Sequence, residues 1–387
     1  MARTVTFSQS GGVIPYIYIY IDSVDYSSRV EYVEHHEEAY RDRAIIGLSN
    51  RDNSLDSLDI DGKEFEIGYG YGGEKVDTAT LEVKSHQIIS VEGERIYQIY
   101  AEGMWMALRQ QKMIAGMMQW AASTAVVLNQ LIQAVTPNGH MYKVVVAGTT
   151  GTTEPTWSTT SAGQVVDGTV TWEEAGIAAP YSNTFNKTHT VEGLIQMIIE
   201  AMGWTWTAVA TSDGIIDVFT PVFDINQLPY ENAAALLYRL IWMTKSYLRA
   251  KPTKTFEAVY PQSTDAINEI YYSNKAHWFF EYEDKSILLI PNSIVVLCNQ
   301  DPVSGEWATD EYPLILGTAS DATQITKYRE IVQPFLAGSI DNQTDADNRA
   351  AAILTRLKAE TLAGRLIVPH DARVELYDRV GVWDLRT

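Results

Sequence analysis

The strictest constraint on the fold is a run of alternating residues near the N-terminus. Over Ile14–Ile21, three tyrosines, Tyr16, Tyr18 and Tyr20, alternate with isoleucines. Successive side chains of a β-strand point to opposite faces, so this period of two predicts a strand whose two faces are both covered. Further short strands separated by turn residues are expected, and their close spacing predicts an antiparallel barrel or sandwich. They are Glu64–Tyr71, Thr78–Val83, Gln87–Val91 and Ile96–Ala101.

Composition narrows the class of protein. The 387 residues include 49 Asp and Glu against 29 Lys and Arg, a net charge of −20, which disfavours nonspecific binding to nucleic acid. The single cysteine, Cys298, excludes an intramolecular disulfide framework and a cysteine-rich zinc site. No segment reaches the roughly 18 apolar residues of a membrane span, and the first ten residues lack the pattern of a secretory signal. We therefore expect no membrane span and synthesis in the cytoplasm.

The order of expected elements divides the chain into five parts. Helix-forming residues predict helices over 104–115 and 121–135, and apolar stripes at helical spacing predict helices over 190–201, 230–248 and 345–362. The expected fold class is mainly β (α+β), with two β-barrel-like domains, packed helices and a small inserted β module. The parts are a first β-domain over 1–103, a helical segment over 104–136, the inserted module over 137–181, a helical and β connecting region over 182–252, and a second β-domain over 253–387.

No residue pattern in the chain demands an enzyme. His35 and His36 are adjacent, so on a strand they point to opposite faces and cannot chelate one metal ion together. The zinc motif His-Glu-x-x-His, the nucleophile elbow Gly-x-Ser-x-Gly and the phosphate-binding loop do not occur in the sequence. Cys298 ends an apolar run, which favours a buried thiol over a nucleophile. We expect no catalytic residue, no cofactor and no metal ion.

The expected inserted module has a sequence pattern of its own. Gly148–Trp157 is rich in threonine and glycine, and Val166–Trp172 follows it with the turn dipeptide Asp167-Gly168. Trp157 and Trp172 can pack against each other as a small core, which we favour, or stack on a sugar. The pattern resembles a small β module that recurs in tail fibres, baseplate proteins and other virion proteins of tailed bacteriophages.

A second, more diffuse resemblance covers most of the chain outside this module. It is carried by the helix over 345–362 with the strands that follow it, Gly364–Pro369 and Val374–Val380, and by the earlier patterns over 190–203 and 230–261. Together they resemble the tail hub proteins of tailed bacteriophages. Members of that family form a trimeric ring at the tip of the tail tube, and two β-barrel tube domains per subunit match the sixfold tube.

The hub resemblance implies a location and a set of partners. The chain would lie at the tail tip or baseplate of the virion, after assembly in the host cytoplasm. Its partners would be two further copies of itself, the tail tube and distal tail proteins, tail tip or fibre proteins, and phage DNA in transit. We expect Tyr16, Tyr18 and Tyr20 to lie at a subunit interface. We also expect carboxylates to line the DNA channel, because they repel phosphate.

Two other classes of function remain open. A carbohydrate-binding tail protein that recognises a host receptor would use Trp157 and Trp172 against a cell-surface glycan. A cell-wall glycan hydrolase would need a pair of carboxylates, and a chain with 49 acidic residues offers too many pairs to single one out. Copy number in the virion separates a hub from a receptor-binding protein, and clearing of a cell-wall suspension would reveal a hydrolase.

Overall fold

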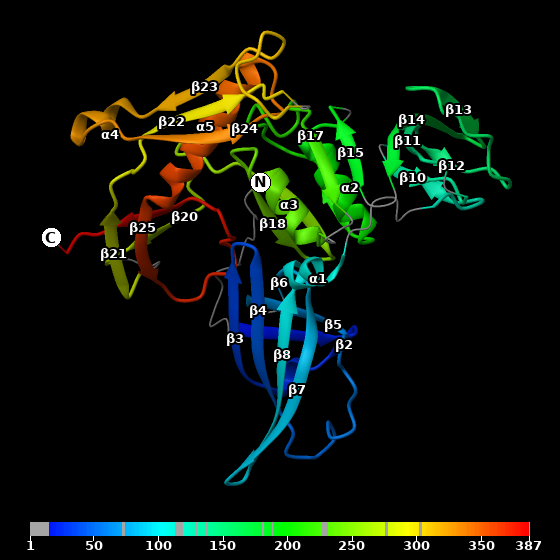
Figure 1. Ribbon diagram of the computed structural model, residues 1–387. Coiled ribbons are helices and arrows are strands. Elements are labelled where there is room, and N and C mark those ends of the chain that lie inside the picture. Colours follow the sequence, from blue (N-terminus) through cyan, green and yellow to red (C-terminus); the bar gives the residue numbers. More distant parts are fainter. Residues whose placement is uncertain are drawn as a thin grey trace.

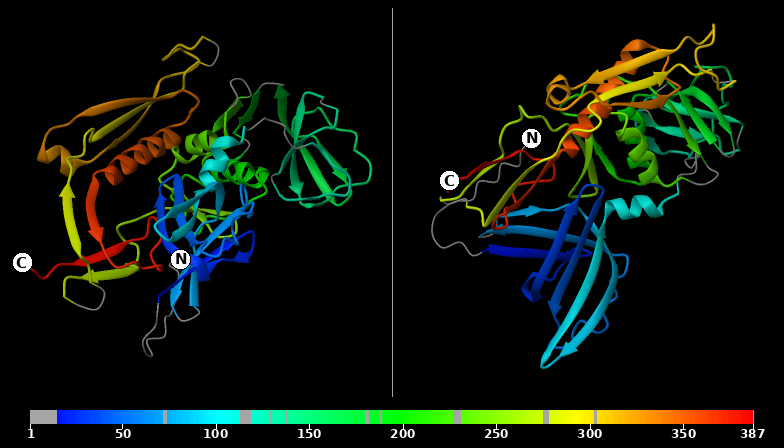
Figure 2. Two further views of the ribbon diagram at one scale, coloured as in Figure 1. Left: turned by 90° about the horizontal axis from the view of Figure 1, so that it is seen from below. Right: turned by 60° about the vertical axis from the view of Figure 1, so that its left-hand side comes forward.

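The structure is a computed structural model that describes residues 15–386 apart from 72–73, 113–118, 129, 137, 180–181, 188, 227–230, 275–277 and 302–303. In this part of the chain, strands greatly outnumber α-helices, so the prediction of a mainly β fold is confirmed (Figures 1 and 2). No described helix has the length and apolar character needed to cross a membrane.

The N-terminal part forms one antiparallel sheet with the strand order β2-β1-β5-β7-β8-β4-β3, and β6 pairs with β5 beside this path. Among the described residues β2 and β3 end the order without pairing to each other, so this sheet is open and not a closed barrel. Figure 1 shows β7 and β8 extending together beyond the other strands. The elements are β1 Pro15–Ile21, β2 Val24–Asp25, η1 Ser27–Arg29, β3 Val30–Glu38, β4 Arg41–Ser49, β5 Glu64–Tyr71, β6 Glu74–Asp77, β7 Leu81–Val91 and β8 Glu94–Gly103.

Residue alternation explains which face of this sheet forms its core. Ile19 and Ile21 of β1 are buried, whereas Tyr16 is 42% exposed, so within one chain only the isoleucine face is fully covered. The loop between β4 and β5 closes the core, because Leu55 is buried in it. Fully buried Asn50 fixes this loop by accepting a hydrogen bond from the backbone N–H of Leu55 at 3.0 Å.

Three helices and a small sheet form the centre of the molecule. They are α1 Met104–Gln110, α2 Val191–Ala201, α3 Ala233–Ile241, β16 Thr205–Thr207, β18 Tyr247–Lys251 and β19 Thr255–Val259. The apolar faces of the helices pack into one core with Trp204 and Phe256. The helix predicted over 190–201 is confirmed, and Thr190 caps it by accepting from the N–H of Gly193. The helix predicted over 230–248 is shorter, because its last predicted residues start β18.

A separate small sheet lies at the side of these helices (Figure 1). The helix predicted over 121–135 is wrong. That segment contains two short strands, over 125–126 and 131–133, because Val126 and Ile132 are buried in one small core with Trp172. The predicted limits of the module, Pro137 and Pro180, lie outside the described residues. One sheet contains β10 Leu131–Gln133, β11 His140–Val146, β13 Gln164–Asp167, β14 Val170–Ala179, β15 Ser182–Asn186 and β17 Val222–Asn226. Beside it, β9 Ala125–Val126 pairs with β12 Gly148–Thr149 as a separate two-stranded sheet.

The C-terminal part contains a three-stranded sheet, β23-β22-β24, with helix α5 on one face. Gly317 lets α5 approach β23, because a Cβ there would collide with the carbonyl of Ala346. The helix predicted over 345–362 is confirmed and begins two residues earlier, since Asn342 caps it. Two-stranded ribbons pair β20 with β26 and β21 with β25. The elements are β20 Glu269–Tyr272, β21 Glu281–Ser286, β22 Ser293–Cys298, β23 Ile315–Ser320, α4 Ala322–Lys327, β24 Val332–Ala337, α5 Gln343–Glu360, β25 Leu362–Ile367 and β26 Val380–Trp383.

Candidate functional site

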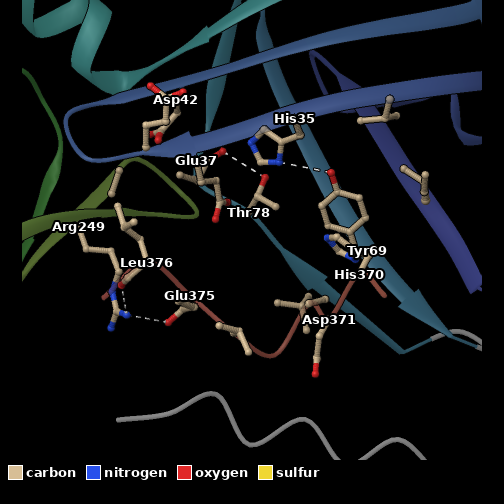
Figure 3. Close-up of a pocket in the computed structure, with 18 of the residues that line it drawn as sticks. His35, Glu37, Asp42, Tyr69, Thr78, Arg249, His370, Asp371, Glu375 and Leu376 are labelled. Atoms are coloured by element: carbon tan, nitrogen blue, oxygen red, sulfur yellow. Dashed lines mark hydrogen bonds and ion pairs between the residues drawn. The ribbon is translucent and has the colours of Figure 1, made fainter. Parts of the chain in front are cut away.

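A cavity of about 690 Å³ with mixed polar and apolar walls lies between the first sheet and residues 369–379, a segment called the strap below (Figure 3). Strands β1, β3, β4 and β5 supply one wall, β18 supplies another, and the first part of the strap supplies a third. The cavity therefore marks the place where the N-terminal and C-terminal parts of the chain meet. Its ionisable and polar side chains include His35, Glu37, Asp42, Tyr69, Arg249, His370 and Asp371.

Two histidines flank one tyrosine at the rim of this cavity. The Nδ1 atom of His35 lies 3.3 Å from the hydroxyl of Tyr69, and the rings of Tyr69 and His370 are 4.2 Å apart between centroids. Burial, together with the charges of His370 and His36, lowers the pKa of His35 to about 4. Burial also lowers the pKa of His370, against the opposing effect of Asp371. Both rings are therefore neutral near pH 7.

Asp42 is the buried carboxyl group of the same cavity. Burial first, and then the nearby charges of Glu37 and Glu38, raise the pKa of Asp42 to about 7. It packs against Gly103 at the end of β8, where a Cβ atom would collide with the Asp42 side chain. Asp42 therefore carries a proton for much of the time at neutral pH and below.

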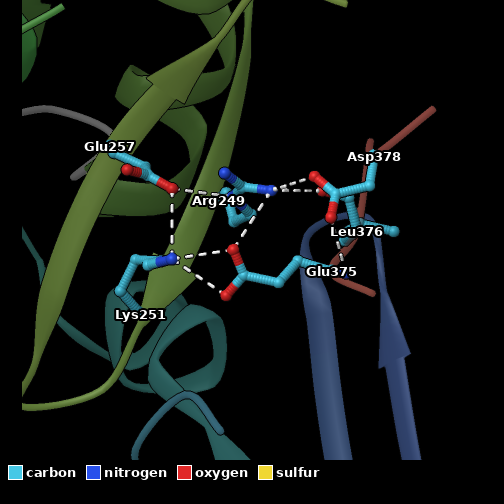
Figure 4. A network of polar contacts seen from close by, with 6 residues as sticks. All are labelled: Arg249, Lys251, Glu257, Glu375, Leu376 and Asp378. Carbon is cyan, nitrogen blue, oxygen red and sulfur yellow. Dashed lines mark hydrogen bonds and ion pairs between the residues drawn. The ribbon is translucent and has the colours of Figure 1, made fainter. Parts of the chain in front are cut away.

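A network of ion pairs holds the far end of the strap (Figure 4). Arg249 of β18 donates to Glu257 at 2.7 Å, to Asp378 at 3.1 Å and to the carbonyl of Leu376 at 3.0 Å. Lys251 donates to both oxygens of Glu375 at 2.9 Å. The side chains of Arg249, Glu375 and Asp378 are each less than 10% exposed. Buried pairs of this kind fix the position of the strap, since separating them leaves an uncompensated charge.

The two tryptophans predicted for the inserted module lie together. The rings of Trp157 and Trp172 meet edge to face at 5.8 Å, and the Trp157 ring stacks on Tyr142 at 4.1 Å. Trp172 is fully buried, and its indole N–H donates to Asp167 at 3.1 Å. A buried indole offers no free face to a sugar, so this geometry favours a packed core over glycan stacking.

The three tyrosines predicted for an interface lie on the outer face of β1. The rings of Tyr16 and Tyr18 are 4.8 Å apart, and the ammonium of Lys75 lies 4.7 Å from the centroid of Tyr20. Lys75 also pairs with Asp77 at 3.0 Å. This face is thus aromatic and partly exposed, and it carries a cation held above the rings.

A second exposed surface, called the bare face below, lies on the side of β22-β23-β24 opposite α5. Registered neighbours Leu297, Leu316 and Leu336 share this face, and Leu336 is 73% exposed. The three strands contain no charged residue. A continuous uncharged apolar surface of this kind is typical of protein interfaces.

Sequence reasoning singled out His35 but missed the cavity around it. Its partners Tyr69 and His370 come from another strand and from the far end of the chain, so no local spacing pointed to them. Within the described ranges, no group of three or more His, Cys, Asp or Glu is arranged to hold a metal ion. The thiol of Cys298 is buried, and burial raises its pKa to about 11.

Comparison with known proteins identifies the fold. No protein-family model and no curated protein matches the sequence. The tail protein from Neisseria meningitidis MC58 is similar in structure, with a TM-score of 0.53 and 9% identity, over 96% of this chain and 86% of that one. The chain has a phage-tail-protein fold. The 43 kDa tail protein of prophage MuSo2 from Shewanella oneidensis agrees, with a TM-score of 0.54 and 11% identity over 95% of this chain and 88% of that one.

Proposed function

We propose that the chain is a structural protein of the virion tail, a tail or baseplate hub that forms a homotrimeric ring. The ring caps the tail tube, connects it to the tail tip and lets DNA pass. The observation that carries this proposal is the shared fold along 96% of the chain with a protein described as a tail protein. The role is one of assembly, and no catalytic step is assigned to the chain.

The bare face supports assembly with further copies. Exposed leucines on an uncharged sheet lose contact with water when another protein covers them, and this burial favours association. Among the described residues, β23 and β24 each pair with no strand other than β22. Side chains of α5 already engage the edge of β23, because Asp347 accepts from the N–H of Thr318 and Gln343 donates to the carbonyl of Leu316. The edge of β24 is therefore the one that can extend the sheet into a neighbouring chain. In the proposed ring the sheet of β22, β23 and β24 is completed by a contact of this kind.

The channel of the proposed ring is expected to be acidic. The net charge of −20 makes carboxylates available, and carboxylates lining the passage would repel the phosphates of DNA. The inserted module would lie at the periphery of the ring, where it contacts a neighbouring baseplate protein or a cell-surface glycan. Its packed tryptophans favour protein contact there.

Two measurements test this proposal. Native mass spectrometry of the purified chain is expected to give a trimer, and a map of the virion tail is expected to place three copies on the tail axis. A stable monomer that also lies off the axis in the virion would overturn the proposal. A basic or mainly apolar lumen in that map would remove the electrostatic part of it.

A further inference from the structure

The two ends of the strap are held by different chemistry. Its far end carries the ion pairs of Glu375 and Asp378 with Arg249, which are independent of histidine. Its near end rests on the first sheet through the contact of His370 with Tyr69, beside His35. The cavity of about 690 Å³ lies directly under this near end, so the contact is not reinforced by close packing (Figure 3).

We propose that the strap is an acid-released latch between the first sheet and the C-terminal part of the chain. When His35 and His370 take up protons, one cation stands at the hydroxyl of Tyr69 and the other against its ring. The two cations repel each other, and the buried His35 cation regains water only when the strap moves away. Both effects detach residues 369–372 from β3 and β5. The ion pairs of Arg249 keep the far end attached, so the strap swings open and does not leave the molecule.

The other charged groups around the two rings do not neutralise them. On the strap, Asp371 is bound to Arg373 at 2.6 Å and to the hydroxyl of Tyr271 at 3.3 Å. Glu375 is engaged by Lys251 and Arg249. On β3, the carboxylate of Glu37 also lines the cavity and opposes release. On β4, Asp42 holds its proton below a pKa of about 7 and so offers no negative charge.

The sign of the pH dependence follows from these environments. The pKa of His35 is about 4 in the closed state against a usual 6.5, so its contribution to the closed state is complete above pH 6.5 and is lost as pH falls toward 4. Lowering the pH from 7 to 5 should favour opening by about 20-fold from His35 alone, and by more when His370 contributes. Asp42 has the opposite sign, and its contact with Gly103 at the end of β8 does not involve the strap.

Hydrogen–deuterium exchange of the full chain tests the latch. Protection factors, corrected for the intrinsic pH dependence of exchange, are measured for peptides covering residues 369–376 at pH 7, 6 and 5. We expect protection to fall by at least about 20-fold between pH 7 and 5, while peptides from α2 and β22 keep theirs. Unchanged protection of the strap, or an equal loss in all three segments, would overturn the proposal.

Variants separate the histidines from the rest of the protein. His35→Gln combined with His370→Phe keeps a polar group beside Tyr69 and a ring against it, and removes both titrations. We expect this double variant to lose the pH response of the strap. His86→Gln is the matched control, because His86 lies on β7 outside the cavity, pairs with Asp61 at 2.8 Å and also stacks on a tyrosine, Tyr97. A double variant that responds like the wild type would contradict the latch.

A measurement on the unaltered chain keeps the test decisive if the double variant does not fold. The logarithm of the strap protection factor is followed in small steps from pH 6.5 to 4.5. Each histidine that takes up a proton on opening should give a slope approaching tenfold per pH unit. A slope near zero over this range would refute proton-driven opening.

Discussion

The N-terminal sheet and the sheet of β22, β23 and β24 cover their apolar side chains in different ways. The N-terminal sheet curves around a core of its own, which the loop carrying Leu55 and Ile60 closes without any helix. The C-terminal sheet has three strands, uses α5 to cover one face and leaves the other exposed. The first has a complete core within one chain and leaves only the tyrosine face of β1 partly exposed, whereas the second is half covered. The difference indicates which part of the molecule depends on its neighbours.

The second sheet also depends on the centre of its own chain. Arg356 of α5 is buried and donates to the carbonyls of Ile241, Thr244 and Ser246 after helix α3. Its guanidinium lies 4.9 Å from the ring centroid of Trp242 and 4.7 Å from that of Tyr247. One side chain thus joins the C-terminal sheet to the central helices.

The largest effect is therefore expected from Arg356→Ala. The change removes the guanidinium donor from the carbonyls of Thr244 and Ser246, whereas Ile241 keeps the Thr244 hydroxyl as a donor. It also removes the packing of the guanidinium, and we expect a total cost of about 4 kcal/mol in unfolding free energy. Urea unfolding measures this loss. Lys358→Ala is the control, because Lys358 pairs with Asp321 near the surface and its loss should cost less than about 1 kcal/mol. Equal effects of the two changes would show that Arg356 does not join the two parts.

A smaller loss is expected from Ile46→Ala in the N-terminal sheet. Ile46 is fully buried, and truncation should cost about 3 kcal/mol through lost burial and the cavity left behind. Ile45→Ala is the matched control, because Ile45 is the next residue of β4 and lies on the opposite, half-exposed face. Amide hydrogen exchange measures the result. We expect Ile46→Ala to lower the protection of the first sheet and to leave the protection of α5 unchanged.

The elements that sequence reasoning placed correctly have strong local patterns. The alternation in β1 and the apolar stripes of α2 and α5 follow from burial of one face, which a sequence records directly. The helix predicted over 121–135 was wrong because its alanines and leucine favour a helix locally, whereas tertiary packing of Val126 and Ile132 against Trp172 favours strands. The helix propensity of a segment does not decide its structure where packing on a neighbouring sheet buries more apolar surface.

The candidate sites also divide into those that local sequence could predict and those that it could not. The packing of Trp157 with Trp172 was foreseeable because both belong to one short module. The cavity was not, since it joins His35 and Tyr69 to His370 across nearly the whole chain. The bare face was not foreseeable either, because Leu336 has the same sequence pattern whether its strand is covered on one face or on two.

Removal of residues 120–175, which contain the core around Trp172, should cost the rest of the molecule about 2 kcal/mol, mainly through the lost burial of Met141 in the central core. Strands β15 and β17 stay in place. Residues paired across adjacent strands give the distance that a linker must span. Gln119 is paired with Gln133, Gln133 with Met141, and Met141 with Gly176. Gln119 and Gly176 are therefore three strand spacings of about 4.8 Å apart, roughly 14 Å in all. A linker of about six Gly and Ser residues can span this distance in place of residues 120–175.

The variant without the small sheet is expected to keep the oligomeric state of the intact chain in native mass spectrometry. Trp157→Ala serves as the matched control, because it disturbs only the core of the small sheet. Loss of assembly in the shortened chain but not in Trp157→Ala would show that the removed segment contributes to the contact between subunits.

The smallest effect on the single chain is expected from Leu336→Glu on the bare face. Leu336 is 73% exposed, so a charge there should change the unfolding free energy by less than about 0.5 kcal/mol. In an assembly the same carboxylate would be buried without a partner, which should weaken association by at least about tenfold. Gln333→Glu places the same charge on β24 with the opposite side-chain direction, so it separates the bare face from charge alone. Sedimentation at several concentrations measures both variants. Dissociation by Leu336→Glu but not by Gln333→Glu would establish that the half-covered sheet is completed by a neighbour, whereas unchanged association of both would mean that the bare face stays exposed and that copies meet elsewhere.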